Sequence, residues 1–177
     1  MECYATGYQN AHVRAYRGAG PESVVYNTTV KDHIRNVQEP AFDAVVETQP
    51  DALYILFGTN TLVNGSEDTA TKFITYYEKM IDMFHESLPN VPIYVQSIPG
   101  VQEWGKDSKP GLQNDRIKLV NNLLANMALR KGCYFVNIAE ALNQPDGSQI
   151  DEYEADGIHM QPVGYTAWCN YQATHTA

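Results

Sequence analysis

The sequence predicts an α/β fold in which a parallel sheet lies between layers of helices. Three short apolar runs, at 52–57 (ALYILF), 93–98 (IYVQSI) and 133–138 (CYFVNI), are expected to be strands because they are rich in β-branched and aromatic residues. Their apolar character is continuous rather than alternating, which is typical of parallel strands covered on both faces. Parallel strands need helical crossovers, and right-handed crossovers complete a three-layer α/β/α sandwich.

The first crossover is an amphipathic pattern between the first two strands. Its apolar positions recur at helical spacing: Phe73, Tyr77, Met80, Ile81, Phe84 and Leu88. Ser66 is the expected N-cap, with the acidic Glu67 and Asp68 in the first turn. These signals predict a helix that returns the chain to the start of the next strand.

The second crossover lies between the second and third strands. Its apolar face consists of Ile117, Val120, Leu124, Met127 and Ala128. Lys131 and Gly132 are expected to end this helix. The central unit is therefore β-α-β-α-β.

Further elements flank this unit. Residues 12–16 are a strand candidate, 17–21 (RGAGP) a loop and 41–48 a short helix. Downstream, Pro162 suits the first turn of a helix that runs to about Thr174. The 177 residues, 44% of them hydrophobic, fit a single domain over 1–177.

Composition excludes several classes of function. The net charge of −9, with only 12 Lys and Arg residues, disfavours nucleic acid as a partner. The sequence has no apolar window of about 18 residues, so no membrane span is expected, and the N-terminal MECYATGYQN lacks the pattern of a signal peptide. Cys3, Cys133 and Cys169 are too scattered for a disulfide framework or a zinc site. We expect buried free thiols and neither a metal nor a cofactor.

Candidate site residues follow the predicted strands, because ligands of open parallel sheets bind beyond the carboxyl ends of the strands. Three loops qualify: 58–60 (GTN), 97–100 (SIPG) and 156–160 (DGIHM). Asp156 precedes His159 at a spacing that lets its carboxylate accept the imidazole Nδ1 proton and leave Nε2 as a general base. The alternative is a turn aspartate beside a helix-capping histidine.

Asn60 is the candidate in the first of these loops. It follows a strand and a glycine, so its side-chain NH₂ can point at a developing oxyanion, a contact worth about 3 kcal/mol. The alternative is an ordinary turn asparagine.

The combination of 57–60 (FGTN) with 156–159 (DGIH) and 162–165 (PVGY) resembles the SGNH hydrolase family of GDSL-type esterases and lipases. A further glycine of that family, in the loop after its second strand, corresponds to Gly18 or Gly20 in YRGAGP. The resemblance therefore runs through essentially the whole chain. It implies a flavodoxin-like parallel sheet.

The resemblance also implies roles for these residues. His159 would be the general base and Asp156 would orient it, while the Asn60 side chain and the backbone N–H of Gly18 or Gly20 would form the oxyanion hole. The implied partners are small-molecule acyl or acetyl esters of carbohydrates or lipids. Their hydrolysis would pass through an acyl-serine and need no metal or cofactor.

Two departures from the family pattern bear on activity. Thr61 stands where the family commonly has Asp, which leaves the contact expected of Asn60 intact. The larger departure is the absence of the family's Gly-Asp-Ser segment. The chain opens at Met1, shortly before the strand candidate at 12–16, and so has no room for that segment. We expect an N-terminal truncation that removed the nucleophile and any leader.

The same truncation would remove the first strand, which is central in the family's sheet and lies between 12–16 and 52–57. Burial of its apolar side chains is worth on the order of 10 kcal/mol, similar to the net stability of a domain. We therefore expect a gap or weak pairing at that position and marginal stability.

Three residues are candidates to replace the nucleophile: Ser97, Ser23 and Cys3. Each has a simpler role, respectively as a pocket or loop residue, as a turn or helix cap, and as a terminal thiol. We expect a serine ester hydrolase that is inactive or nearly so as this fragment. The alternative is a noncatalytic domain that binds an acylated carbohydrate or lipid, with Trp104 a candidate for the pocket rim.

Overall fold

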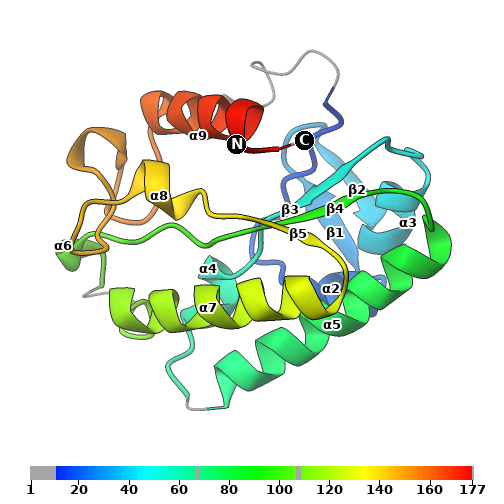
Figure 1. Cartoon of the computed structure of the whole chain (residues 1–177), viewed down its shortest axis with the longest axis horizontal. Helices are drawn as coiled ribbons and strands as arrows, with labels where there is room; N and C mark the ends of the chain where they lie inside the picture. Colours follow the sequence, from blue (N-terminus) through cyan, green and yellow to red (C-terminus); the bar gives the residue numbers. More distant parts are fainter. Residues whose placement is uncertain (1–10, 67, 107–108, 177) are drawn as a thin grey trace.

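The computed structural model describes residues 11–66, 68–106 and 109–176 (Figure 1). In chain order the elements are α2 (Pro21–Val25), β1 (Thr29–Asp32), β2 (Val37–Pro40), α3 (Ala41–Val46), β3 (Leu53–Ile55), α4 (Thr59–Leu62), α5 (Thr69–Ser87), β4 (Ile93–Gln96), α6 (Glu103–Lys106), α7 (Asn114–Arg130), β5 (Tyr134–Val136), α8 (Ala139–Leu142), the 3₁₀ helix η1 (Asp151–Tyr153) and α9 (Pro162–His175). The alternation of strands and helices confirms the predicted α/β class.

The central sheet consists of β3, β4 and β5 in that order, and all of its pairs are parallel. Tyr54, Tyr94 and Tyr134 are register partners on the three strands, and their rings stack with centroids 4.5 and 4.9 Å apart. Each strand is shorter than the apolar run that predicted it, because the last residues of each run leave the ladder to form the loops at the carboxyl edge.

Helices α5 and α7 cover one face of this sheet and α9 covers the other (Figure 1). Strand β4 is buried on both faces: Ile93 and Val95 join the core under α5 and α7, whereas Tyr94 packs with Trp168 of α9. The side-chain oxygen of Gln96, at the end of the strand, accepts a 2.7 Å hydrogen bond from the Trp168 indole. The predicted three-layer sandwich is confirmed, and burial on both faces explains the continuous apolar runs.

The start of α5 differs from the prediction. The helix begins at Thr69, with Asp68 at the cap position. Ser66 lies before it, and its hydroxyl contacts the side chains of Asp68 and Thr69 at 3.0 and 2.6 Å. The assignment of Ser66 as N-cap is therefore wrong, because its oxygen is engaged by neighbouring side chains. Glu67 lies outside the described residues.

The ends of the later helices agree with the sequence. Lys131 caps α7, and Gly132 follows with a φ of +68°, the left-handed conformation that glycine adopts readily. Helix α9 starts at Pro162 and extends one residue beyond Thr174, to His175. No helix in the described ranges is long and apolar enough to cross a bilayer.

The N-terminal part differs most from the prediction. Helix α2 and the antiparallel pair β1–β2 were not expected, and residues 12–16 form no strand. Tyr16 alone pairs, in an isolated bridge with Asp32, because the Asp32 carboxylate takes the N–H of Ala15 that a ladder would use. The predicted gap beside β3 depends on segments outside the described ranges and stays a prediction.

The cysteines are less buried than expected. Cys133 and Cys169 have intermediate exposure and form no disulfide within the described residues, and Cys3 lies outside them. Burial raises the pKa of the Cys133 thiol to about 11, so it is protonated at neutral pH. Across the described part of the chain, no three His, Cys, Asp or Glu side chains are grouped to hold a metal ion.

Candidate active site

Asp156 and His159 share a tight turn, residues 154–160, which we call the dyad turn. An antiparallel bridge between Glu154 and Met160 closes it. His159 Nδ1 lies 2.7 Å from Asp156 Oδ2. The other carboxylate oxygen accepts the backbone N–H groups of Ile158 at 3.1 Å and His159 at 2.8 Å. One carboxylate therefore fixes both the fold of the turn and the orientation of the imidazole.

The side chains of the dyad are open to solvent, with His159 74% and Asp156 56% exposed. Partial burial acts to raise the pKa of Asp156, but hydrogen bonds from the backbone and ring of His159 outweigh it, so the pKa lies below its ordinary value. An ionised Asp156 holds the imidazole proton on Nδ1. Nε2 is then the acceptor nitrogen, as a general base requires.

The dyad turn is packed against the loop after β4. Gly157 is buried with a φ of +81°, and a Cβ there would lie 2.8 Å from the Cα of Gly105. Gln102 donates its N–H to the Gly157 carbonyl at 2.8 Å. Trp104 of α6 is 54% exposed, and its Cδ2 lies 3.2 Å from the same Cβ position. An exposed indole therefore adjoins the turn that carries His159.

Asn60 lies in the short helix α4, directly after β3. Gly58 precedes the helix with a φ of +150°, and any Cβ there would lie 2.1 Å from Ile98 Cδ1. Glycine is thus required where the chain leaves the sheet. Asn60 is exposed, and its side-chain N–H donates to the Ala19 carbonyl at 3.4 Å. This long contact joins α4 to the loop at 17–21, which we call the glycine loop.

The two candidate glycines of that loop have different surroundings. Gly18 has a φ of +75° and open space where a Cβ would be. Gly20 is buried at the N-cap of α2, and a Cβ there would lie 2.5 Å from Glu22 Oε2 and 2.8 Å from Thr61 Oγ1. Gly20 is therefore the candidate that packs against the helix of Asn60.

Arg116 holds the carboxyl end of α4. Its Nη1 lies 3.1, 2.9 and 3.0 Å from the carbonyl oxygens of Leu62, Asn64 and Gly111, and Nη2 lies 3.1 Å from that of Ser66. The last carbonyls of a helix have no partner within the helix, and a cation stabilises them. Arg116 thereby fixes the helix on which Asn60 is carried.

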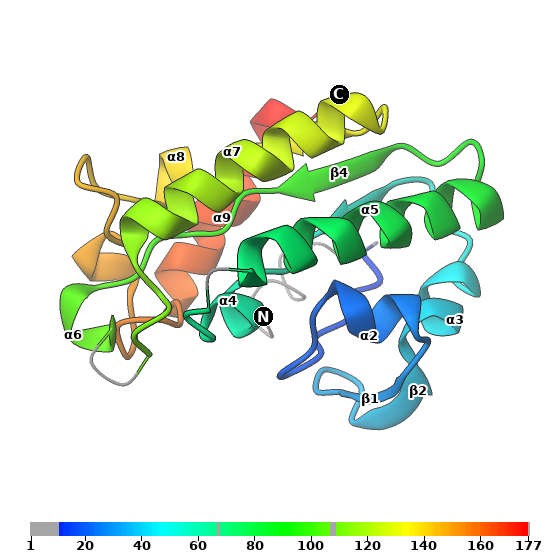
Figure 2. The same cartoon turned by 90° about the horizontal axis from the view of Figure 1, so that it is seen from below.

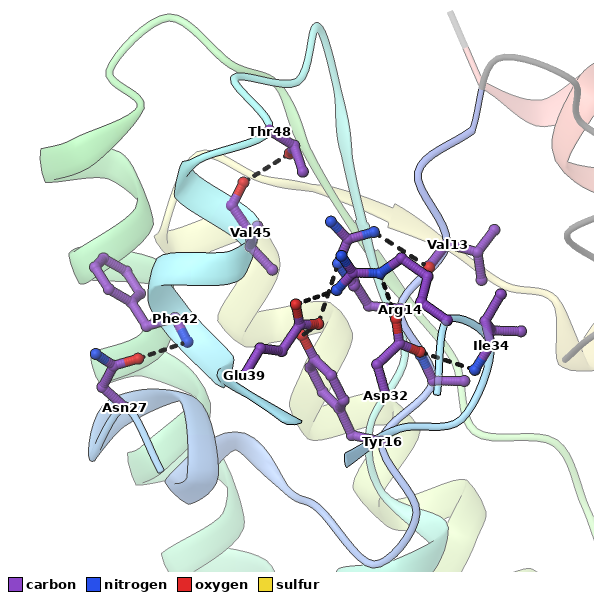
Figure 3. A network of polar contacts seen from close by, with 12 residues as sticks. Val13, Arg14, Tyr16, Asn27, Asp32, Ile34, Glu39, Phe42, Val45 and Thr48 are labelled. Carbon is purple, nitrogen blue, oxygen red and sulfur yellow. Dashed lines mark hydrogen bonds and ion pairs between the residues drawn. The ribbon is translucent and has the colours of Figure 1, made fainter. Parts of the chain in front are cut away.

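A buried carboxylate fixes the segment that leads into the glycine loop (Figure 3). Asp32 is fully buried and accepts the N–H groups of Ala15 at 3.3 Å and Ile34 at 2.9 Å, and the Arg35 guanidinium at 2.7 Å. Burial alone would raise the pKa of Asp32, but these hydrogen bonds lower it below its ordinary value. Asp32 is therefore charged at neutral pH.

Glu39 extends this network on the neighbouring strand. It accepts the Tyr16 hydroxyl at 2.8 Å and forms ion pairs with Arg35 and, at 3.3 Å, with Arg14 (Figure 3). Burial, and then the bond to Glu39, raise the pKa of Tyr16 well above its ordinary range. The hydroxyl therefore stays protonated and links the strand to the start of the glycine loop.

The candidate residues form two groups on one side of the sheet. Figure 2 shows that β4 points toward the side where α4 and α6 lie. Contacts join Asn60 to the glycine loop and His159 to Asp156. Within the described residues, no hydrogen bond links one group to the other.

The candidate substitute nucleophiles are engaged elsewhere. Ser97 is fully buried, and its hydroxyl accepts the Ala139 N–H at 2.9 Å. Ser23 accepts the Gly20 N–H at 3.5 Å in the capping of α2, and Cys3 lies outside the described residues. No serine of the described chain is hydrogen-bonded to His159.

The comparisons with known proteins identify the family. The chain matches the GDSL-like lipase/acylhydrolase family model over residues 3–167. The chain belongs to the GDSL-like lipase/acylhydrolase family. No protein with a curated description matches it.

Solved structures share the fold of this GDSL-like protein. A structure from Streptococcus pneumonia has a TM-score of 0.70 and 20% identity, covering 90% of this chain and 69% of its own. The acetyl xylan esterase AlAXEase has a TM-score of 0.65 and 15% identity, covering 90% of this chain and 77% of its own. A GDSL-like lipase from Bacteroides thetaiotaomicron has a TM-score of 0.61 and 18% identity, and the alignment covers 75% of this chain but only 64% of that one.

Two residues of the site region in this GDSL-like protein, Glu22 and Arg116, were not predicted from the sequence. The sequence position of Arg116 could have indicated its role. It lies in the first turn of α7, where a cation is locally unfavourable, so a tertiary partner is required. The sequence position of Glu22 gives no such indication, because an acidic residue in the first turn of a helix is ordinary.

Proposed function

We propose that this GDSL-like protein carries the base and oxyanion-hole parts of a serine ester hydrolase site. His159 is the general base, Asp156 orients it, and the Asn60 side chain with the Gly20 N–H stabilises the oxyanion. In this role the Gly20 N–H exchanges its long 3.5 Å contact with Ser23 Oγ for the oxyanion. The observation that carries the proposal is the 2.7 Å contact between His159 Nδ1 and Asp156 Oδ2. This contact sets the tautomer that a base needs.

In the proposed reaction a serine hydroxyl attacks the ester carbonyl while His159 Nε2 takes its proton. The carbonyl oxygen becomes an oxyanion, which accepts hydrogen bonds from Asn60 and the Gly20 N–H. When the carbon–oxygen bond to the alcohol breaks, His159 returns the proton to the leaving oxygen. Water then hydrolyses the acyl-serine with the same base.

Acylated carbohydrates are the substrates that we favour over lipids. Trp104 supports this choice, because an indole that is 54% exposed beside the dyad turn offers a flat face to a sugar ring. Two solved structures of the same fold are described as an acetyl xylan esterase and a family 3 carbohydrate esterase.

The nucleophile is the component that the described residues do not supply. Ser23 and Ser97 are occupied in capping and in a buried hydrogen bond, and neither is bonded to His159. We infer that the chain by itself hydrolyses esters slowly or not at all. The same observation favours a second candidate function, a noncatalytic domain that binds an acylated carbohydrate or lipid.

Fluorophosphonate labelling separates these functions, with mass spectrometry to locate an adduct and a p-nitrophenyl acetate assay alongside. We expect no adduct and no turnover from the folded chain, and turnover once an upstream Gly-Asp-Ser strand is added. An adduct on Ser97 or Ser23 with turnover would identify a substitute nucleophile. A folded but inactive version with the added strand would leave the binding domain as the function.

A further inference from the structure

A pocket with a mixed lining, more apolar than polar, lies between α2, α4 and the start of α5. Its volume is about 290 Å³, and its lining includes Glu22, Thr61, Asn64, Ser66, Lys72 and Tyr76. Pockets for drug-sized ligands have about 300–1,000 Å³, so this one lies just below that range and suits a single ring rather than a long chain. Its lining residues take no part in the proposed ester chemistry.

The pocket adjoins the proposed oxyanion hole. Thr61 directly follows Asn60 in α4. The position that a Cβ of Gly20 would occupy lies 2.7 and 2.5 Å from the two Glu22 carboxylate oxygens and 2.8 Å from Thr61 Oγ1. A carboxylate and a hydroxyl therefore converge on the backbone of the glycine that we place in the oxyanion hole.

Neither the Thr61 hydroxyl nor the Glu22 carboxylate has a side-chain partner among the described residues. Thr61 Oγ1 is buried and has no hydrogen-bond partner in the described chain, although buried hydroxyls are nearly always paired. Across the same residues Glu22 has no ion-pair partner, whereas Lys72 pairs with Asp68. The unpaired carboxylate repels anions and accepts hydrogen bonds from neutral donors. A ligand with adjacent hydroxyl groups satisfies both side chains at once.

We propose that this pocket binds the hydroxyl groups of a sugar residue in the substrate, an inference that rests on the proposed function. Glu22 accepts hydrogen bonds from the sugar, and Thr61 both donates and accepts one. The rings of Phe73 and Tyr76, which also line the pocket, provide an apolar wall for the sugar carbons. An acyl chain would leave Thr61 and Glu22 unpaired, so the pocket selects carbohydrate over lipid.

The test is calorimetric titration of the chain with xylobiose, and with octanoate as the lipid-side probe. We expect xylobiose to bind and octanoate not to bind. Thr61→Val should weaken xylobiose binding at least tenfold. The ligand-free melting temperature should stay equal or rise, because the hydroxyl that is removed has no partner in the free protein. Thr71→Val, on the exposed side of α5, is the matched control and should bind normally.

A second variant tests the pocket independently, in case Thr61→Val does not fold. Glu22→Gln should also weaken xylobiose binding, and Glu86→Gln, an exposed change on α5, should not. His159→Ala should bind xylobiose as the wild type does, which separates this pocket from the catalytic proposal. Unchanged affinity in both pocket variants, absence of xylobiose binding, or binding of octanoate instead would overturn the proposal. Xylobiose binding by a folded version of the chain that carries the added Gly-Asp-Ser strand but hydrolyses no ester would contradict only the catalytic function.

Discussion

The two halves of the candidate site are built in different ways. The dyad turn is local: Asp156 contacts the backbone and the ring of a residue three positions away, and both side chains are largely exposed. The proposed oxyanion side is assembled from distant segments, since Asn60 meets Ala19 across 41 positions and Arg116 reaches Leu62 across 54.

Because of this difference, we expect mutations in one half to affect activity and mutations in the other half to affect stability. A change at His159 or Asp156 removes a group of the proposed base but little buried structure, so its effect should be confined to activity. A change in the supports of the oxyanion side removes buried or shared contacts, so it should cost folding free energy first. The following predictions test this division, from the largest effect to the smallest.

The largest effect is expected from His159→Ala in a version of the chain carrying an upstream Gly-Asp-Ser strand. Hydrolysis of p-nitrophenyl acetate should fall by about 10³-fold or more, because an unassisted serine is a weak nucleophile. The melting temperature should not change, since the side chain is 74% exposed. His175→Ala, at the exposed end of α9, is the control. A large fall in melting temperature would show that the dyad turn also supports the fold.

On the other half, Asp32→Ala should lower the free energy of unfolding by about 3 kcal/mol, because it leaves a buried network without its carboxylate. Urea denaturation followed by circular dichroism measures this loss. Asp51→Ala, at an exposed position, should be nearly neutral. An equally small effect at Asp32 would mean that the glycine loop is held by other contacts.

Arg116→Ala should lower the free energy of unfolding by about 2 kcal/mol, since several carbonyl oxygens lose a charged donor. Arg116→Lys should recover part of this, because an ammonium group cannot reproduce the planar fork. Arg130→Ala, which breaks a surface pair with Glu78, is the control and should change stability little. Equal losses for Arg116 and Arg130 would contradict the proposed clamp on α4.

A smaller effect is expected at the rim of the dyad turn. In the version with the added strand, Trp104→Ala should lower kcat/KM for an acetylated xylo-oligosaccharide by roughly fivefold, equivalent to about 1 kcal/mol of aromatic contact. Hydrolysis of p-nitrophenyl acetate should stay unchanged, and Trp104→Tyr should retain the sugar preference. An equal loss on both substrates would assign Trp104 to packing.

The smallest effect is the pH dependence of stability. The pKa of Asp32 is lower in the folded than in the unfolded chain, so its stabilising contribution is complete above the unfolded pKa of about 3.9. That contribution is lost as pH falls through the folded pKa. The urea midpoint should therefore drop between pH 5 and pH 2, and less steeply in Asp32→Asn. Parallel curves for the two proteins would assign acid sensitivity to other carboxylates.

The fold was predictable where its signals are local. The crossover helices and the strands of the parallel sheet follow from apolar spacing along single segments, and both were confirmed. The hairpin β1–β2 was not predicted, because its strands are mostly exposed and carry no apolar run. The strand expected at 12–16 was wrong, since Asp32 takes the N–H of Ala15 with a side chain rather than with a strand backbone.

The sequence by itself determined the family pattern and the dyad turn, because Asp156 and His159 lie within one turn and need only local geometry to meet. Only the tertiary structure showed that Gly20 packs against Thr61 whereas Gly18 has open space, and only it brought Glu22 beside Thr61. It also revealed the clamp of Arg116 on α4. These contacts join segments that are far apart in the chain, and their side chains carry no periodic signal. Their partners are therefore set by how the layers pack, and not by the spacing of residues.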